Sequence, residues 1–223
     1  MIRGSRSVPA TEIPDPAPEN RMSDALLFAR KFARKGRAIA SIGPSGPDMC
    51  EAMVRDLDFS RPGVIVELGA GTGAITRSIV SRLQPHHRFI AVELESDFVD
   101  ILRGRFPQTE IVRGDATSME GTLDQLGVRQ VRYVLSGLAT PHLPLRAQVR
   151  LHRWLMNRLD PDGAYVQITY VPRIYANYYR RHFRDVRYTP IWKNVPPGGV
   201  FFCRDIRSTV ASRKRRNRLL AKV

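Results

Sequence analysis

The stretch Val66-Glu67-Leu68-Gly69-Ala70-Gly71-Thr72-Gly73 decides the fold of this 223-residue chain. A run of apolar residues leads into one acidic residue and then into three glycines at alternate positions. Glycine lets the backbone approach a ligand closely, because a Cβ atom at the same position would collide with it. The stretch therefore predicts a buried strand over 63–68 whose carboxyl end forms part of a ligand site.

Two further acidic residues follow at intervals of about one strand–helix unit. Glu93 ends the run Phe89-Ile90-Ala91-Val92-Glu93, and Asp115 follows Ile111-Val112-Arg113-Gly114. Together with Glu67, they are expected at the carboxyl ends of three consecutive strands, where an open parallel sheet binds nucleoside ligands. We expect Glu93 to bind ribose hydroxyls, Asp115 to accept from an adenine amino group, and Glu67 to face a cationic group.

Two alternatives to this interpretation remain open. Each carboxylate can simply end a strand or cap a helix. The spacing Gly69-x-Gly71-x-x-Ala74 also satisfies a relaxed dinucleotide-binding pattern. A dinucleotide site, however, places pyrophosphate at a helix N-terminus and needs no carboxylate before the glycines. Glu67 therefore favours a nucleoside ligand that carries a positive charge, such as an amino-acid ammonium.

Beyond residue 62 the chain alternates strand and helix patterns. Strands are predicted near 63–68, 88–93, 109–113, 130–136, 163–170, 184–192 and 199–207, and helices near 73–83, 96–106, 119–126, 144–159 and 173–183. No helix separates the last two strands, which implies a hairpin. The pattern predicts an α/β fold: a doubly wound, Rossmann-like sheet of seven strands with a C-terminal antiparallel hairpin, preceded by an N-terminal amphipathic helix.

The composition limits the partners and the compartment. The net charge is +15, from 36 Lys and Arg against 21 Asp and Glu, which indicates a polyanionic partner, either nucleic acid or an anionic membrane surface. No apolar run is long enough to span a bilayer and no signal peptide is recognisable, so we expect a cytoplasmic protein. Cys50 and Cys203 have no metal-ligand spacing, so we expect free thiols and no metal site.

Four segments are predicted along the chain. Residues 1–20 are rich in proline and are expected to be disordered, and 21–45 are expected to form the basic amphipathic helix. The α/β domain is expected to occupy 46–208. Residues 209–223 form a basic tail that contains Arg213-Lys214-Arg215-Arg216-Asn217-Arg218.

The predicted N-terminal helix has two unlike faces. Phenylalanine, alanine and isoleucine gather on one side and cations on the other, a pattern typical of a helix that lies in a membrane interface. The residues expected to bind the membrane are Phe28, Arg30, Lys31, Phe32, Arg34 and Lys35. Two alternatives remain: the aromatic face covers the domain as an ordinary helix, or the basic face binds RNA.

Over residues 60–207 the chain resembles the class I S-adenosylmethionine-dependent methyltransferases, and within them bacterial phospholipid N-methyltransferases. The resemblance rests on the amphipathic segment, on Ala40-Ser41-Ile42-Gly43-Pro44-Ser45, on 66–73, on Ser136-Gly137-Leu138 and on Trp192-Lys193-Asn194-Val195-Pro196-Pro197. It implies S-adenosylmethionine as the cofactor. The residues implied to bind it are Glu67, Gly69, Ala70, Gly71, Gly73, Glu93, Leu94, Asp115, Ala116 and Ser136.

The loop after the fourth predicted strand is expected to face the transferred methyl group. It reads Leu135-Ser136-Gly137-Leu138-Ala139-Thr140-Pro141-His142. Methyltransferases that act on adenine amines typically carry Asn/Asp-Pro-Pro-Tyr/Phe there, so that polar groups hold the amine and an aromatic ring stacks on the base. This loop has neither the asparagine nor the aromatic residue, which argues against an RNA adenine N6-methyltransferase.

An alkyl amine needs deprotonation, positioning and space for a methylated cation, which aromatic rings accommodate. The residues predicted to act in catalysis are Tyr170, His142 and Ser136, and those predicted to bind the substrate are Tyr170, Tyr178, Tyr179 and Arg180. Among them, His142 is the candidate base. For Tyr165, in the same aromatic stretch, a core position is the alternative, and for Arg180 a solvated helix face is the alternative.

The leading hypothesis is an enzyme at the inner face of the cell membrane that N-methylates phosphatidylethanolamine, in repeated rounds, toward phosphatidylcholine. Anionic phospholipids are its expected membrane partners. The runner-up is an RNA methyltransferase, which the positive charge and the two basic segments favour. A third alternative is a non-catalytic module that keeps the fold and binds RNA or lipid.

Overall fold

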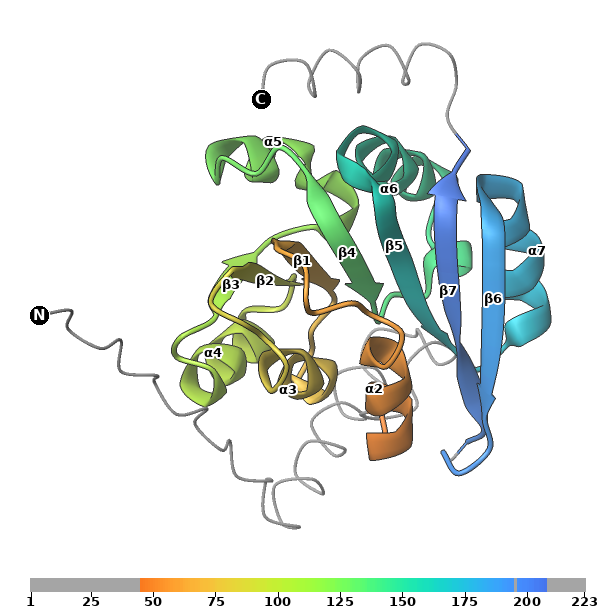
Figure 1. The fold of residues 1–223 in the computed structure, drawn as a ribbon, viewed down its shortest axis with the longest axis horizontal. Helices are drawn as coiled ribbons and strands as arrows, with labels where there is room; N and C mark the ends of the chain where they lie inside the picture. The colour runs from red at the N-terminus through yellow and green to blue at the C-terminus, as the bar shows by residue number, and fades with distance from the viewer. Residues whose placement is uncertain (1–44, 195, 208–223) are drawn as a thin grey trace, which may run out of the picture.

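Strand β1 (Gly63–Leu68) is an interior strand of a seven-stranded sheet in the computed structural model, which describes residues 45–194 and 196–207 (Figure 1). The other strands are β2 (His87–Glu93), β3 (Glu110–Arg113), β4 (Val131–Ser136), β5 (Leu159–Thr169), β6 (Phe183–Ile191) and β7 (Gly198–Ile206). Their order across the sheet is β3-β2-β1-β4-β5-β7-β6. Strand β7 runs opposite to the other six strands and pairs with β5 and β6. The predicted doubly wound sheet with a C-terminal antiparallel hairpin is therefore confirmed.

Helices cover both faces of the sheet. On one face lie α2 (Pro47–Val54), α3 (Ala74–Val80) and α4 (Ser96–Arg105), and on the other α5 (Met119–Gln125), α6 (Leu145–Arg158) and α7 (Pro172–His182). Short 3-10 helices, η1 (Ala116–Ser118) and η2 (Thr140–His142), follow β3 and β4. Adjacent residues of one strand point to opposite faces, and both faces are covered. The central strands are therefore largely apolar, with Glu67 in β1 and Arg132 in β4 as exceptions.

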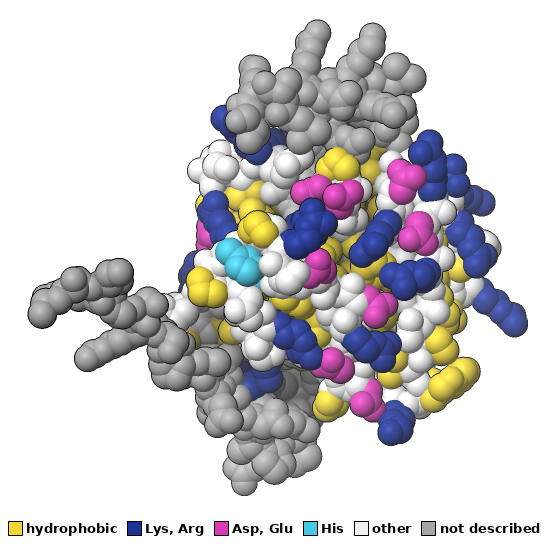
Figure 2. All heavy atoms as spheres, viewed as in Figure 1, with side chains coloured by type: hydrophobic (Ala, Val, Ile, Leu, Met, Phe, Trp, Pro, Cys, Tyr) yellow, Lys and Arg dark blue, Asp and Glu magenta, His cyan; other side chains and the backbone are white. Residues whose placement is uncertain are grey.

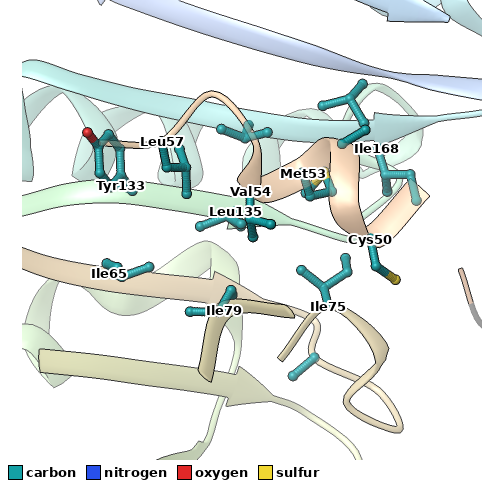
Figure 3. Packing of buried hydrophobic residues seen from close by; sticks show 14 of the residues in the cluster. Cys50, Met53, Val54, Leu57, Ile65, Ile75, Ile79, Tyr133, Leu135 and Ile168 are labelled. Carbon is teal, nitrogen blue, oxygen red and sulfur yellow. The ribbon is translucent and has the colours of Figure 1, made fainter. Parts of the chain in front are cut away.

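The first core lies between the sheet and helices α2, α3 and α4. Figure 3 shows Met53 and Val54 of α2 beside Leu135 of β4, with Ile168 of β5 close by. Pro47 stands in the first turn of α2, where its missing N–H costs nothing and its fixed φ favours the helix. Helix α2 therefore stands across β4 and β5, with its first turn at the carboxyl end of the sheet.

The second core, on the opposite face, also contains polar groups with defined partners. Trp154 is buried, and its Nε1–H donates to the carbonyl oxygen of Ala116 at 3.1 Å. The buried guanidinium of Arg158 donates to the carbonyl oxygen of Val128 at 3.0 Å and pairs with Asp124. These bonds hold α6 against η1 and against the segment that enters β4.

The predicted element boundaries agree with the structure within a few residues, with one larger difference. Strand β5 begins at Leu159, whereas its start was predicted near 163. The sequence Asp160-Pro161-Asp162-Gly163 is typical of a turn. In the structure the strand continues through it with a shifted register opposite Val131 and Tyr133. The prediction of the strand's start was wrong because a β-bulge uses the same residue types as a turn.

The sequence-based expectations for the ends of the chain lie outside the described residues. They comprise the disordered tail at 1–20, nearly all of the amphipathic helix at 21–45, and the basic tail at 209–223. Cys50 and Cys203 are both buried free thiols. Among the described residues, no helix has the length and apolar character needed to cross a membrane.

Replacement of Met53 by alanine should lower the free energy of unfolding by about 2–5 kcal/mol, because Met53 is 1% exposed and its loss leaves a cavity under α2. Urea unfolding followed by circular dichroism measures the change. Asp48→Ala, on the exposed side of the same helix, is the matched control and should change the value by less than about 0.5 kcal/mol. Equal losses in both variants would contradict the packing described for α2.

Candidate active site

The glycine-rich turn after β1 leads directly into α3. Gly69, Gly71 and Gly73 have φ values of 72°, 57° and 90°, in the left-handed region that side chains disfavour. At Gly73 a Cβ atom would lie 2.4 Å from the ring of Phe106, so a larger residue would also collide there. The turn is held to the next strand, since the Gly69 N–H donates to the Val92 carbonyl oxygen at 2.9 Å.

Glu67 lies at the end of β1, beneath this turn, with no exposed surface. Its Oε2 accepts a hydrogen bond from the Thr76 hydroxyl at 2.6 Å, whereas its buried Oε1 has no partner among the described residues. The pKa of Glu67 is raised to about 8, chiefly by burial. The hydrogen bond from Thr76 opposes this shift, and the nearby charge of Glu93 contributes to it. A buried carboxylate oxygen without a donor is costly, so this atom is suited to a cationic ligand group.

The carboxylate of Glu93, at the end of β2, binds three backbone N–H groups. Its Oε2 accepts from Gly71 at 2.8 Å, and its Oε1 accepts from Leu94 at 2.7 Å and from Glu95 at 3.0 Å. Each carboxylate oxygen has two acceptor sites, so Oε2 retains one for a ribose hydroxyl. Glu93 thus joins the glycine turn to the start of α4 and faces the site predicted for the ribose.

Asp115 follows β3 at the same edge of the sheet. Its Oδ1 accepts from the N–H and the hydroxyl of Thr117, both at 2.8 Å, and its Oδ2 lies 3.3 Å from the Arg150 guanidinium. The structure thus shows the capping arrangement that was the alternative for this residue, and a bond to an adenine amine stays a prediction. Ala116 is buried next to it, whereas Leu94 is 57% exposed beside Glu93.

A buried polar network lies beneath the loop after β4. The side-chain oxygen of Gln167 accepts from the hydroxyls of Tyr165, Tyr179 and Thr140, at 2.7, 2.9 and 3.1 Å. Its Nε2 donates to the Leu138 carbonyl oxygen at 2.8 Å. One side chain of β5 therefore connects α7 and η2 to the loop that is predicted to face the methyl group.

Ser136 and Leu138 shape this loop. The Ser136 hydroxyl is fully buried and accepts from the Leu138 N–H at 3.2 Å, which makes a tight turn at the end of β4. The Leu138 side chain packs over the glycine turn, since a Cβ atom on Gly69 would lie 2.8 Å from it. Ser136 therefore supports the loop from below, and its predicted contacts with cofactor and substrate stay predictions.

The sequence did not single out Gln167 and Thr140. A glutamine inside an apolar strand reads as an interruption, although a buried polar residue there is itself a signal that it has hydrogen-bond partners. Thr140 is 1% exposed in a loop that reads as solvated. Both residues contribute to the site because their buried hydrogen bonds hold the loop after β4 in place.

The predicted tyrosines lie in three different environments. Tyr170 follows β5 and is half-buried; burial raises its pKa, and hydrogen bonds with Ser45 and Asn194 oppose the shift. Tyr178 is half-buried, with its ring 5.1 Å from that of Tyr179 and perpendicular to it. Tyr179 is 1% exposed, so its side chain contacts the interior of the domain. Tyr170 directly follows a strand at the carboxyl edge of the sheet, so its contact with a substrate stays a prediction.

Asn194 connects the turn between β6 and β7 to the start of α2. Its Oδ1 accepts from the Gly46 N–H at 3.1 Å, and its Nδ2 donates to the Pro196 carbonyl oxygen at 2.8 Å. The hairpin turn, Tyr170 and the first residues described before α2 thus meet at the carboxyl edge of the sheet. This arrangement gives a structural role to the late Trp192-Lys193-Asn194 motif.

The remaining predicted residues are on the surface or outside the described part. His142 is exposed on η2, with its ring 6.0 Å from that of Tyr175, and Arg180 is exposed on α7. The six residues predicted to bind the membrane, between Phe28 and Lys35, lie outside the described residues. Within 45–194 and 196–207 no group of His, Cys, Asp and Glu side chains is arranged to hold a metal ion.

Replacement of Glu67 by glutamine should remove the pH dependence of binding to S-adenosylmethionine, the cofactor that the resemblance implies. In the parent, ionisation of Glu67 near pH 8 should make the affinity rise from about pH 6 to about pH 7.5, below the pKa of the ligand's own amino group. Binding should also release protons. Calorimetry in buffers of different ionisation enthalpy measures both effects. Asp100→Asn is the control; equal pH profiles for parent and Glu67→Gln would refute the assignment.

Replacement of Gln167 by leucine should lower the free energy of unfolding by about 1–3 kcal/mol, because three buried hydroxyls and the Leu138 carbonyl lose their partner. Turnover should fall as well, since the loop loses its support. Tyr165→Phe removes one donor and leaves the others, so its loss should be smaller. Urea unfolding and initial rates measure the two effects, and a fully active, fully stable Gln167→Leu protein would contradict the role.

Comparisons of the sequence with known proteins find methyltransferases. A family model described as a methyltransferase domain matches residues 65–163, from β1 through the start of β5. The ornithine lipid N-methyltransferase of Singulisphaera acidiphila is 39% identical over 191 residues, which are 84% of this chain and the whole of that protein. The ribosomal RNA small subunit methyltransferase A of Salinibacter ruber is 35% identical over only 65 residues, 29% of this chain and 21% of that protein.

Solved structures show the same fold at low sequence identity. A methyltransferase from Geobacter sulfurreducens has a TM-score of 0.55 at 14% identity, over 86% of this chain and 93% of that one. Human methyltransferase-like protein 13 in complex with SAH has a TM-score of 0.52 at 15% identity, over 88% and 93%. With this fold, and with a relative matched over its whole length, the chain belongs to the class I S-adenosylmethionine-dependent methyltransferases, and S-adenosylmethionine is its cofactor.

Proposed function

We propose that this enzyme transfers methyl groups to the primary alkyl amine of a membrane aminolipid. The observation that carries the proposal is the similarity to a lipid N-methyltransferase over that protein's full length. The name of the relative favours an ornithine lipid as the acceptor, whereas the sequence resemblance led us to phosphatidylethanolamine. Both lipids carry a primary alkyl amine, so the same chemistry serves either of them.

The loop after β4 supports an alkyl amine over an adenine amine. Its side chains between Ser136 and His142 include no carboxamide or carboxylate, so only backbone carbonyls remain to hold a planar amine. The carbonyl of Leu138 is already bonded to Gln167. The loop also contains no tyrosine, phenylalanine or tryptophan that would stack on a base. An alkyl amine requires neither feature.

Once bound, S-adenosylmethionine supplies an electrophilic methyl group on its sulfonium. Glu67 and Glu93 would hold its ammonium and its ribose, while the glycine turn excludes side chains from the space between them. The raised pKa of Tyr170 keeps its hydroxyl protonated at neutral pH, so it can orient the amine through a hydrogen bond but does not serve as the base. His142 remains the candidate base, and positioning supplies most of the rate.

An RNA substrate remains the second candidate because ribosomal RNA methyltransferases also match the chain. Those matches cover at most 42% of it, a share close to that of the cofactor-binding half. In Figure 2, Lys and Arg side chains over the centre of the visible face are interspersed with Asp and Glu, whereas several Lys and Arg side chains gather along the upper right edge. The centre of this face therefore lacks the continuous basic surface that favours binding along an RNA backbone.

The proposed location is the cytoplasmic face of the membrane, reached without a spanning segment in the part of the chain that the structure describes. The predicted amphipathic helix with Phe28 and Phe32 would bring the enzyme to anionic phospholipids. A positively charged protein accumulates at such a surface, where its substrate also lies.

Incubation with radiolabelled S-adenosylmethionine tests the proposal, with ornithine lipid, phosphatidylethanolamine and total RNA supplied in parallel, the lipids in detergent micelles. We expect label in at least one aminolipid and none in RNA. Phosphatidylcholine is the matched negative control, because its nitrogen has no lone pair to methylate. Label in RNA alone would refute the proposal and establish the runner-up.

A further inference from the structure

Exposed hydrophobic side chains gather at one edge of the domain. Leu94, Leu145, Ile174 and Trp192 are each more than half exposed and follow β2, β4, β5 and β6, respectively. These four strands run in the same direction, so all four side chains lie at the carboxyl edge of the sheet, toward which the arrows of β4 and β5 point in Figure 1. This is also the edge of the cofactor site.

Three of these residues lie on segments that contact one another. Helix α7, which carries Ile174, packs against η2, which leads into Leu145, and the rings of His142 and Tyr175 lie 6.0 Å apart. Tyr170, just before α7, hydrogen bonds with Asn194 in the same turn as Trp192. The segments that carry Leu145, Ile174 and Trp192 are therefore neighbours along this edge.

The charge along these segments has one sign. Residues 137–150, 170–181 and 190–198 contain no Asp or Glu, and an exposed cation stands beside each apolar residue. We call the resulting set the docking rim: Leu145, Arg146, Arg173, Ile174, Trp192 and Lys193. Leu94 is excluded from it, because Glu93 and Glu95 flank it.

We propose that the docking rim binds an anionic lipid bilayer. Tryptophan favours the boundary between headgroups and acyl chains, exposed Leu and Ile gain by burial there, and Arg and Lys pair with anionic headgroups. Trp192 is 77% and Leu145 74% exposed, so both can enter the interface without rearrangement of the core. Such isolated apolar groups, with cations next to them in the sequence and no Asp or Glu in the same segments, match this partner better than an acidic or neutral protein surface.

The inference deepens the proposed function, on which its biological meaning rests. With the docking rim at the interface, Tyr170 and the loop after β4 would face the lipid headgroups, and the acceptor amine would not have to leave the membrane plane. This surface belongs to the catalytic domain itself and is distinct from the predicted helix that contains Phe28 and Phe32.

Sedimentation of the full chain with vesicles of phosphatidylcholine and phosphatidylglycerol tests the proposal. The triple variants Leu145→Ser/Ile174→Ser/Trp192→Ser and Arg146→Gln/Arg173→Gln/Lys193→Gln should each bind on the order of tenfold more weakly or worse. The charge-matched control Arg55→Gln/Arg103→Gln/Arg184→Gln, away from this edge, should bind like the parent. Thermal unfolding and cofactor binding, both unchanged, would show that the variants are folded.

The same measurement in a Phe28→Asp/Phe32→Asp background separates the docking rim from the N-terminal helix. The apolar rim variant should weaken the residual binding in that background as well. If the apolar rim variant binds vesicles as well as its parent does in both backgrounds, the docking rim is not a membrane surface.

Fluorescence provides a second, independent readout. Lipids brominated in the acyl chain should quench Trp192 when the protein is bound, whereas buried Trp154 should be shielded. Trp192→Phe should lose the quenching and largely keep the binding. Bound protein without quenching of Trp192 would overturn the proposal.

The two proposals can fail separately. Methylation of aminolipid in micelles together with unchanged vesicle binding of the rim variants would reject the docking rim and leave the proposed function standing. Loss of vesicle binding in the rim variants without any lipid methylation would keep the docking rim as a membrane surface and reject the proposed substrate.

Discussion

The three hydrogen bonds that the Glu93 carboxylate accepts hold the site together. They join the turn after β1 to the start of α4, across the ends of two neighbouring strands. Without them, the buried N–H of Gly71 would lack an acceptor, which costs free energy, and the start of α4 would lose its link to the turn. The turn in turn places α3, whose Thr76 binds Glu67. The geometry of the cofactor site therefore depends on one carboxylate, whose three hydrogen-bond donors are neutral backbone N–H groups.

The strand ends on the two sides of the sheet differ in charge. Strands β1 to β3 carry the acidic residues that suit a cationic nucleoside, whereas the ends of β4, β5 and the hairpin turn carry neutral and basic residues. Under the proposed function, the methyl donor and the acceptor amine would meet at one edge of the sheet and face opposite electrostatic environments. Gln167 links the two halves, because it fixes the loop after β4 that packs over the glycine turn.

The sequence was sufficient to predict the sheet and the strand ends at which the cofactor site is expected. Strands that are buried on both faces read as apolar runs, and an acidic residue at the end of each marks the edge, so Glu67 and Glu93 were placed correctly at strand ends. The start of β5 was not predictable, because Asp160-Pro161-Asp162-Gly163 serves a bulge as well as a turn. Gln167 required the tertiary structure, since its partners come from α7, η2 and the loop after β4, which are distant in sequence. Tyr179 required it as well, since its partner Gln167 lies on β5.

Cys50 shows how the fold restricts the chemistry of a side chain near Glu67. Its thiol is buried in the first turn of α2, and burial, with a smaller contribution from the charge of Glu67, raises its pKa to about 12. At neutral pH the sulfur therefore stays protonated, and a thiol is a far weaker nucleophile than a thiolate. A buried thiol in this state is a poor target for alkylation.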